Sequence, residues 1–221
     1  SGNISKKEIS KFIDIVFSEL PKSDKSTNIP KFDLLKSGES LFNVETPQTA
    51  VVFGQNGLKR NNEDFFAARI VNYVLGGGSF QSRLYKNVRE KKGLVYSIYS
   101  YLLPYQNDGV VVGGFQTRNE SVNKVINMVK KEWKKISNEG ISKEELDNAK
   151  TYFKGSFSRN YTSTMSIANL LEIVQYYKLG KDYFTNRDQI IDRLDLDYVN
   201  NVASKIFDEK KLFFMIVGKP K

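Results

Sequence analysis

The fold class follows from residues 94–116, which read LVYSIYSYLLPYQNDGVVVGGFQ. Two runs in this segment, 94–103 and 110–116, are rich in β-branched and aromatic residues, as strands are. Between them stands the sequence QNDG at 106–109. An Asp-Gly pair between apolar runs is typical of a β-hairpin turn. The segment therefore predicts two antiparallel strands joined by a short loop.

Working outward, two further apolar runs predict buried strands, TAVVFGQ at 49–55 and LFFMIV at 212–217. Capping boxes at Ser5 with Glu8 and at Ser142 with Glu145 predict two helix starts. Apolar spacing predicts helices over 5–20, from 61 to the glycines at 76–78, from there to Gly93, and over 121–136, 142–157, 163–179, 182–193 and 196–207. Residues 22–40 are predicted to be a linker or an extended crossing segment. Together these elements predict an α+β fold, an antiparallel β-sheet with helices packed on one face.

The composition removes several kinds of catalytic chemistry. The 221 residues include no histidine and no cysteine. The commonest general base, the thiolate nucleophile and the imidazole and thiolate ligands of zinc are therefore absent. A serine hydrolase is not supported, because no G-x-S-x-G sequence is present and no histidine can act as the base.

The charge balance leaves two interpretations open. The formal net charge is +9, from 34 basic and 25 acidic residues. A nucleic acid or an anionic surface is one partner that such a charge favours. Acidic residues nevertheless alternate with the lysines, as in KKE at 130–132 and KEE at 143–145, which favours a solvated lysine-rich surface. No apolar run approaches the roughly 18–20 residues of a membrane span.

The sequence GGGS at 76–79 stands between two predicted helices. Glycine amides before a helix can hold a phosphate, but the G-x-x-x-x-G-K-[ST] spacing is missing and no strand precedes the loop. A tight corner between helices, or a flexible loop beside a substrate, is the preferred interpretation. Arg89 lies in the last turn before Gly93, where a cation complements the helix dipole. Tyr96 is predicted to be one aromatic residue of a strand, in the core or on the sheet surface.

A long ungapped segment nevertheless resembles a known family. Residues 75–85 read LGGGSFQSRLY and residues 88–97 read VREKKGLVYS. This resembles the C-terminal, non-zinc-binding domain of insulinase/pitrilysin-type zinc metallopeptidases, the group that includes mitochondrial processing peptidase. The resemblance continues through PQTA at 47–50, GG at 113–114, EELDNAK at 144–150 and IVGKP at 216–220. It also divides the chain into residues 1–22, a helix and linker from the end of the preceding domain, and 23–221, the C-terminal peptidase-family domain.

The resemblance implies a role for particular residues. In this family one domain carries HxxEH and a distal glutamate that bind zinc, and a homologous domain contributes an arginine and a tyrosine seven residues apart. Arg89 and Tyr96 have this spacing and are the catalytic candidates. We assign substrate binding to the preceding motif, namely Gly76, Gly77, Gly78, Ser79 and Arg83. An arginine and a tyrosine hydroxyl are hydrogen-bond donors that can hold a substrate backbone and stabilise negative charge on its oxygen.

The resemblance therefore predicts a substrate-binding and transition-state-supporting domain of a zinc metallopeptidase that cleaves peptides. The expected partners are a zinc-bearing N-terminal domain or homologous subunit and a peptide substrate, without nucleic acid or membrane, and a dimer is compatible with this. Zinc is expected in the partner domain and no cofactor in this chain. One alternative is a structural, non-peptidase member of the same fold, and another is a basic nucleic-acid-binding module. The resemblance and the absence of cysteine favour a bacterial periplasmic enzyme.

The first prediction is that this chain alone holds no zinc. Carboxylates without imidazole or thiolate make poor zinc sites. Metal analysis of the dialysed chain is expected to find no stoichiometric zinc, and one tightly held zinc ion per chain would contradict the prediction.

Overall fold

The computed structural model describes residues 2–22 and 36–221, and its centre is one sheet with the strand order β1-β5-β2-β4-β3. The strands are β1 (Gly38–Asn43), β2 (Gln48–Asn56), β3 (Ile98–Pro104), β4 (Gly109–Arg118) and β5 (Phe213–Gly218). The hairpin predicted from residues 94–116 is present as β3 and β4, which pair antiparallel from Ile98 with Phe115 to Pro104 with Gly109. β2 pairs antiparallel with both β4 and β5. The predicted α+β class is thus confirmed.

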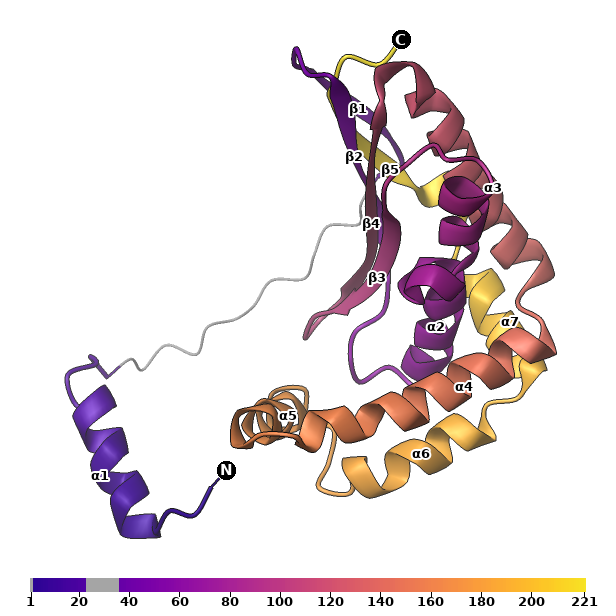
Figure 1. The fold of residues 1–221 in the computed structure, drawn as a ribbon. Helices are drawn as coiled ribbons and strands as arrows, with labels where there is room; N and C mark the ends of the chain where they lie inside the picture. Colours follow the sequence, from indigo (N-terminus) through magenta and orange to yellow (C-terminus); the bar gives the residue numbers. More distant parts are fainter. Residues whose placement is uncertain (1, 23–35) are drawn as a thin grey trace.

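Helices cover one face of the sheet. The α-helices are α1 (Lys6–Phe17), α2 (Phe65–Asn72), α3 (Val122–Glu139), α4 (Lys143–Phe157), α5 (Thr164–Tyr176), α6 (Tyr183–Arg193) and α7 (Leu196–Ile206). Figure 1 shows α2, α3 and α7 against the sheet, with α4, α5 and α6 at the end of the molecule where α2 begins. None of the described helices is long and apolar enough to cross a membrane.

The core forms where the alternating strands meet α3. Phe53 of β2 is buried, and its ring lies 5.5 Å from Trp133 of α3 in an edge-on arrangement and 5.8 Å from Phe214 of β5. The buried Gln55 side chain accepts a hydrogen bond from the Trp133 indole, at 2.7 Å, and another from the Asp208 backbone N–H. One side of β2 is therefore fully engaged, whereas its other side, including Val52, faces outward.

Two boundaries differ from the sequence prediction. β1 lies partly inside the predicted linker 22–40, of which residues 23–35 fall outside the described part. It pairs in parallel with β5, so the sheet is mixed, and its exposed edge position removes the apolar alternation that reveals a strand. β3 begins at Ile98 and not at Leu94, because the Leu94 N–H donates to the Val88 carbonyl and the Leu94 carbonyl accepts from Thr117.

The helices around the glycines also differ from the prediction. α2 continues as a π-helical turn, η1 (Tyr73–Gly77), and the second predicted helix contains a π-helical segment, η3 (Tyr85–Glu90). Between them, η2 (Ser79–Gln81) is a short 3₁₀ turn. π-helical turns are rare and occur mostly as single turns within α-helices, frequently at functional sites. The first π-helical turn includes two of the glycines at 76–78, and the second includes Arg89.

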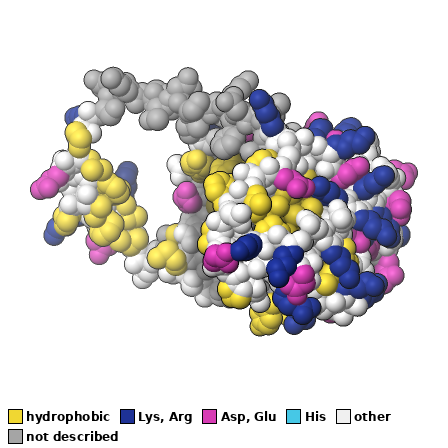
Figure 2. Space-filling model, turned by 90° about the horizontal axis from the view of Figure 1, so that it is seen from above, with side chains coloured by type: hydrophobic (Ala, Val, Ile, Leu, Met, Phe, Trp, Pro, Cys, Tyr) yellow, Lys and Arg dark blue, Asp and Glu magenta, His cyan; other side chains and the backbone are white. Residues whose placement is uncertain are grey.

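α1 begins as predicted, with the Ser5–Glu8 capping box formed. Its apolar residues are all exposed in the described structure, including Phe12, Ile13 and Val16. Figure 2 shows apolar side chains gathered along this helix, and basic side chains interleaved with acidic ones over the visible face of the domain. The interleaving is what the preferred interpretation of the net charge expects.

The corner between α2 and β3 depends on a missing side chain. Asn72 donates to the Ser100 carbonyl at 3.1 Å and accepts from the Ser100 hydroxyl at 2.8 Å, and both residues are buried. Gly76 lies against the same serine, where an added Cβ would be 2.4 Å from Ser100 Oγ and 2.9 Å from Ser100 N. Backbone and side chain of β3 leave no room there for a methyl group.

The second prediction concerns this corner. Gly76→Ala is expected to lower the free energy of unfolding by about 1–3 kcal/mol, because overpacking forces the backbones apart. Gly155→Ala is the matched control, since a Cβ at Gly155 meets no atom within 4 Å and α4 gains a better helix former. Urea denaturation of both variants measures the difference, and equal stability of Gly76→Ala and the unchanged chain would contradict the close packing.

Candidate functional site

Arg89 and Tyr96 are brought together by a turn at Gly93. The Gly93 N–H donates to the Arg89 carbonyl at 2.9 Å, and Gly93 itself adopts φ of 60°, a conformation that favours glycine. The chain reverses there, so that the Arg89 Nε donates to the Tyr96 carbonyl at 2.9 Å. The spacing of seven residues therefore places both side chains at one point of the surface.

Two aromatic rings lie close to the Arg89 guanidinium. Its central carbon lies 4.7 Å from the Tyr85 ring centre and 5.9 Å from the Tyr96 ring centre. Tyr85 is buried and packs edge-on against Phe80 at 4.8 Å. Stacked arginine–aromatic contacts fix the plane of the guanidinium while its outer N–H groups stay available.

Tyr96 itself projects into solvent. It is 88% exposed, and its hydroxyl makes no hydrogen bond to the described residues. Tyr96 also lines an open cavity of about 630 Å³ on the face of the sheet that the helices leave uncovered. The floor and rim of this cavity include Ala50, Val52, Tyr99, Gln116 and Arg118.

The sequence prediction for Tyr96 was therefore wrong in its setting. Tyr96 does not lie in a strand or in the core, but in the loop directly before β3. The Tyr96 hydroxyl is exposed, and Arg89 has no carboxylate partner in the described chain. Both residues therefore present hydrogen-bond donors to solvent. The two residues can hold carbonyl oxygens of an extended backbone or a developing oxyanion.

Tyr85 is the residue that sequence reasoning did not single out for the site. In the sequence it is only the last residue of the quoted motif at 75–85. The available signal was its spacing, because residues four apart on a helix are neighbours and an aromatic residue four before Arg89 can stack on the guanidinium.

The glycine motif has several environments. Gly76 is buried at the Ser100 contact, and Gly77 and Gly78 pack against Asn72 and Tyr73. Only Ser79 is exposed, with φ of 49°. The close packing of these glycines is that of the predicted tight corner between helices. Their assignment to substrate binding stays a prediction.

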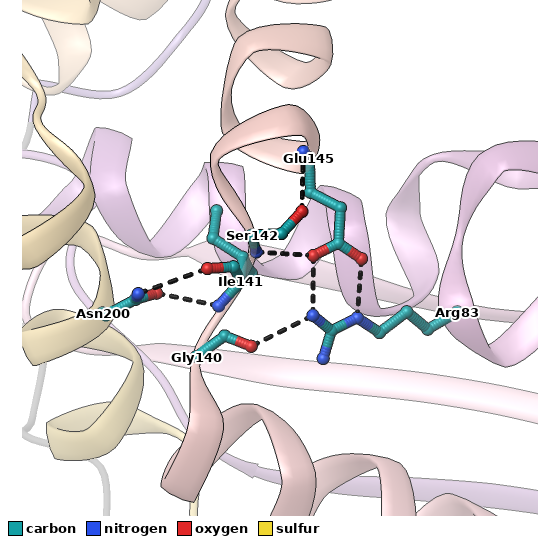
Figure 3. Close-up of polar contacts among 6 residues, drawn as sticks. All are labelled: Arg83, Gly140, Ile141, Ser142, Glu145 and Asn200. Carbon is teal, nitrogen blue, oxygen red and sulfur yellow. Dashed lines mark hydrogen bonds and ion pairs between the residues drawn. The ribbon is translucent and has the colours of Figure 1, made fainter.

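Arg83 binds residues at the N-terminal end of α4 (Figure 3). Its Nε and Nη2 donate to the two carboxylate oxygens of Glu145 at 2.8 and 2.6 Å, and Nη2 also donates to the Gly140 carbonyl at 3.0 Å. Glu145 completes the predicted capping box with Ser142, whose N–H donates to the same carboxylate at 2.8 Å. The Arg83 pair therefore joins the segment after the glycine loop to α4.

The substrate-binding assignment of Arg83 stays open as a prediction. Its remaining nitrogen, Nη1, is buried without a partner in the described chain, and Arg83 lines an open cavity of about 810 Å³ between η3, α3 and α4. Glu132, also buried, contributes a second unpartnered atom, Oε2, among the residues that line this cavity.

The described residues contain no cluster of three or more histidine, cysteine, aspartate or glutamate side chains that could hold a metal ion. The donor set of this part of the chain therefore does not fit a zinc site.

Comparisons with known proteins agree on one family. Residues 1–153 match the family model described as Peptidase M16 inactive domain. An "Uncharacterized zinc protease YmxG" of Bacillus subtilis is 32% identical over 217 residues, which cover 95% of this chain and 50% of the relative. A "Non-peptidase homolog YmxG" of Helicobacter pylori is 30% identical over 190 residues, covering 84% of this chain and 43% of the relative. The chain thus spans about half the length of these relatives.

A solved structure supports the same conclusion. The peptidase M16 inactive domain from Pseudomonas fluorescens superposes with a TM-score of 0.87 at 27% identity. The match covers 100% of this chain and 52% of that one.

The third prediction uses the charge of Glu145. Burial of the Glu145 carboxyl raises its pKa, but hydrogen bonds from Arg83 and Ser142 and the charge of Arg83 outweigh this and hold the pKa below its ordinary 4.5. A lowered folded pKa stabilises the fold above about pH 4.5, and this stabilisation is lost as the pH falls through the folded pKa. Glu145→Gln is expected to cost about 1–3 kcal/mol at pH 7 and progressively less in acid.

Urea denaturation across a pH series measures this difference. Glu144→Gln, at the neighbouring exposed position, is the control that changes the net charge equally. A cost of Glu145→Gln that is the same at pH 3 and at pH 7 would show that the charge of the pair does not contribute.

Proposed function

We propose, from the premise that the chain belongs to the family of peptidase M16 inactive domains, that it binds peptide substrate and supports the transition state in a zinc metallopeptidase. The observation that carries the proposal is the convergence of Arg89 and Tyr96 beside an open cavity. Both present hydrogen-bond donors without an anionic partner in the described chain.

The residues of this chain supply binding and charge stabilisation. The Arg89 guanidinium, fixed by Tyr85 and by the Tyr96 carbonyl, can donate to a substrate carbonyl. The Tyr96 hydroxyl can donate to an oxygen on which negative charge develops, and such donors act best when they are already oriented. The zinc ligands have no counterpart in this chain, so we infer that a zinc-bearing domain of the parent protein, or a homologous subunit, holds the metal.

The same premise extends to the organisation of the parent chain. We propose that residues 1–22 end the preceding domain, and the exposure of the apolar side of α1 supports this, since a helix of this kind normally packs against a partner. The cavity above the open sheet face is then one wall of a space that this domain forms with its partner. An enclosed space of that kind suits extended or unfolded peptides.

A second function is favoured by one specific observation. The Helicobacter pylori relative is named a non-peptidase homolog, so a member similar to this chain is described without peptidase activity. A structural role would need no donors at Arg89 and Tyr96. The preceding sequence of the parent protein separates the two, since HxxEH is required for the zinc peptidase and not for the structural protein.

The fourth prediction tests Arg89 and Tyr96 in the parent protein with a fluorogenic peptide. Tyr96→Phe removes one hydroxyl and is expected to lower kcat roughly 10²–10³-fold, the usual cost of one such donor. Its melting temperature is expected to stay unchanged, because the hydroxyl contacts nothing in the described chain. Arg89→Lys keeps the charge but loses the planar group, and it is expected to lower kcat as well.

Tyr105→Phe is the control, because Tyr105 is an exposed tyrosine beyond the other end of β3. Full turnover in both Tyr96→Phe and Arg89→Lys, with the fold intact, would remove the catalytic-support role. Loss of turnover in Arg89→Lys alone would leave Arg89 as a substrate anchor without a contribution from Tyr96.

A further inference from the structure

Arg69 lies in a second polar setting, away from Arg89 and Tyr96. It belongs to the last turn of α2 and lines a cavity of about 260 Å³ between the α2–η1 corner, the edge strand β3 and α4. Pockets that enclose a drug-sized ligand measure roughly 300–1,000 Å³, so this cavity suits a single side chain or a chain end. Its walls include Tyr73, Tyr101, Tyr152 and Phe153.

The guanidinium of Arg69 has an aromatic contact but no anion. Its central carbon lies 4.7 Å from the ring centre of the buried Phe153. Among the described residues, no carboxylate or other acceptor takes a hydrogen bond from the Arg69 side chain. Burial lowers the pKa of Arg69, and the charges of Arg60 and Arg187 act in the same direction.

Arg69 is half-buried and has no counter-ion among the described residues. Removing a charge from water without a counter-ion costs free energy, and buried charges are ordinarily paired. A cation in a last helical turn can complement the dipole, but the α2 turn that holds Arg69 continues directly into η1. The helix continues into η1, and the Tyr73 N–H donates to the carbonyls of both Arg69 and Ile70.

The neighbouring edge of β3 has backbone groups directed toward the same region. β3 pairs on one side only, with β4. Along its other side the Ser100 carbonyl accepts from Asn72, and the Pro104 carbonyl accepts from Tyr177. Backbone groups alternate in direction along a strand, so Leu102, midway between them, also turns its N–H and carbonyl outward. Leu102 lines the cavity as well.

We propose that the cavity at Arg69 is a subsite for a carboxylate carried by an extended peptide, with Leu102 available to pair with the peptide backbone. The guanidinium matches a carboxylate with two parallel hydrogen bonds, and the aromatic walls cover the hydrocarbon part next to it. The Ser100 and Pro104 carbonyls are already taken on this edge, so Leu102 is the residue between them whose backbone groups can pair with a peptide. The carboxylate is either the C-terminus of the peptide or an aspartate or glutamate side chain.

The inference deepens the proposed function and rests on its peptide substrate, but its test needs neither turnover nor the zinc-bearing partner. Three N-acetylated hexapeptides of alanine and serine are titrated into the 221-residue chain by calorimetry. The first has a free C-terminal carboxylate, the second is its C-terminal amide, and the third is the amide with one glutamate. At least one carboxylate peptide is expected to bind roughly 10–100-fold more tightly than the neutral amide.

Which carboxylate peptide binds more tightly identifies the source of the charge. Arg69→Gln is expected to remove the advantage of both. Arg193→Gln is the matched control, since Arg193 also stands in the last turn of a helix, α6, but is exposed, and this variant is expected to keep the advantage. Arg69→Gln is also expected to melt no lower than the unchanged chain, because it removes an unpaired, partly desolvated charge.

Equal affinity for the three peptides would overturn the subsite, and so would a carboxylate preference that persists in Arg69→Gln. A marked fall in the melting temperature of Arg69→Gln would assign Arg69 to the stability of the fold instead. None of these outcomes depends on the turnover of Tyr96→Phe. The peptide titrations can therefore contradict the carboxylate subsite independently of the proposed catalytic role.

Discussion

The contact of Asn72 and Gly76 with Ser100 positions everything that surrounds the candidate site. The Asn72 side chain exchanges two hydrogen bonds with Ser100, and Gly76 allows the helix corner to approach the strand without a side chain between them. This one contact fixes α2 and η1 at the edge of β3. Arg69 lies on the helical side of the contact, and Arg89 and Tyr96 lie on the segments that follow it.

Three arginines near this corner differ in their interaction partners. Arg83 is neutralised by Glu145 and holds α4 to the segment after the glycines. Arg89 is oriented by a carbonyl and two rings but keeps donors free. Arg69 rests on Phe153 and has no acceptor in the described chain. A paired arginine contributes to the fold, whereas an oriented arginine without an anion is equipped to bind one.

One face of the sheet is not covered by helices and carries exposed apolar side chains. Helices cover the other face of the sheet (Figure 1). Val52, Tyr99 and Met215, on its strands, are exposed. Exposed apolar residues gathered on one face are typical of an interaction or binding surface. The chain matches only about half of the length of the Bacillus subtilis relative and of the Pseudomonas fluorescens structure.

The sequence by itself determined the hairpin, the capped helices at Ser5 and Ser142, and the absence of imidazole and thiolate ligands, because these depend on local pattern and composition. The resemblance of a long motif to a peptidase family indicated Arg89 and Tyr96 as candidates, whereas the residues alone predicted a helix-end cation and a strand aromatic. Only the tertiary structure decided that β1 is a strand, since its pairing partner β5 lies at the far end of the chain. It alone placed Tyr96 in solvent and left Arg69 unpaired, because exposure and ion pairing depend on residues that are distant in sequence.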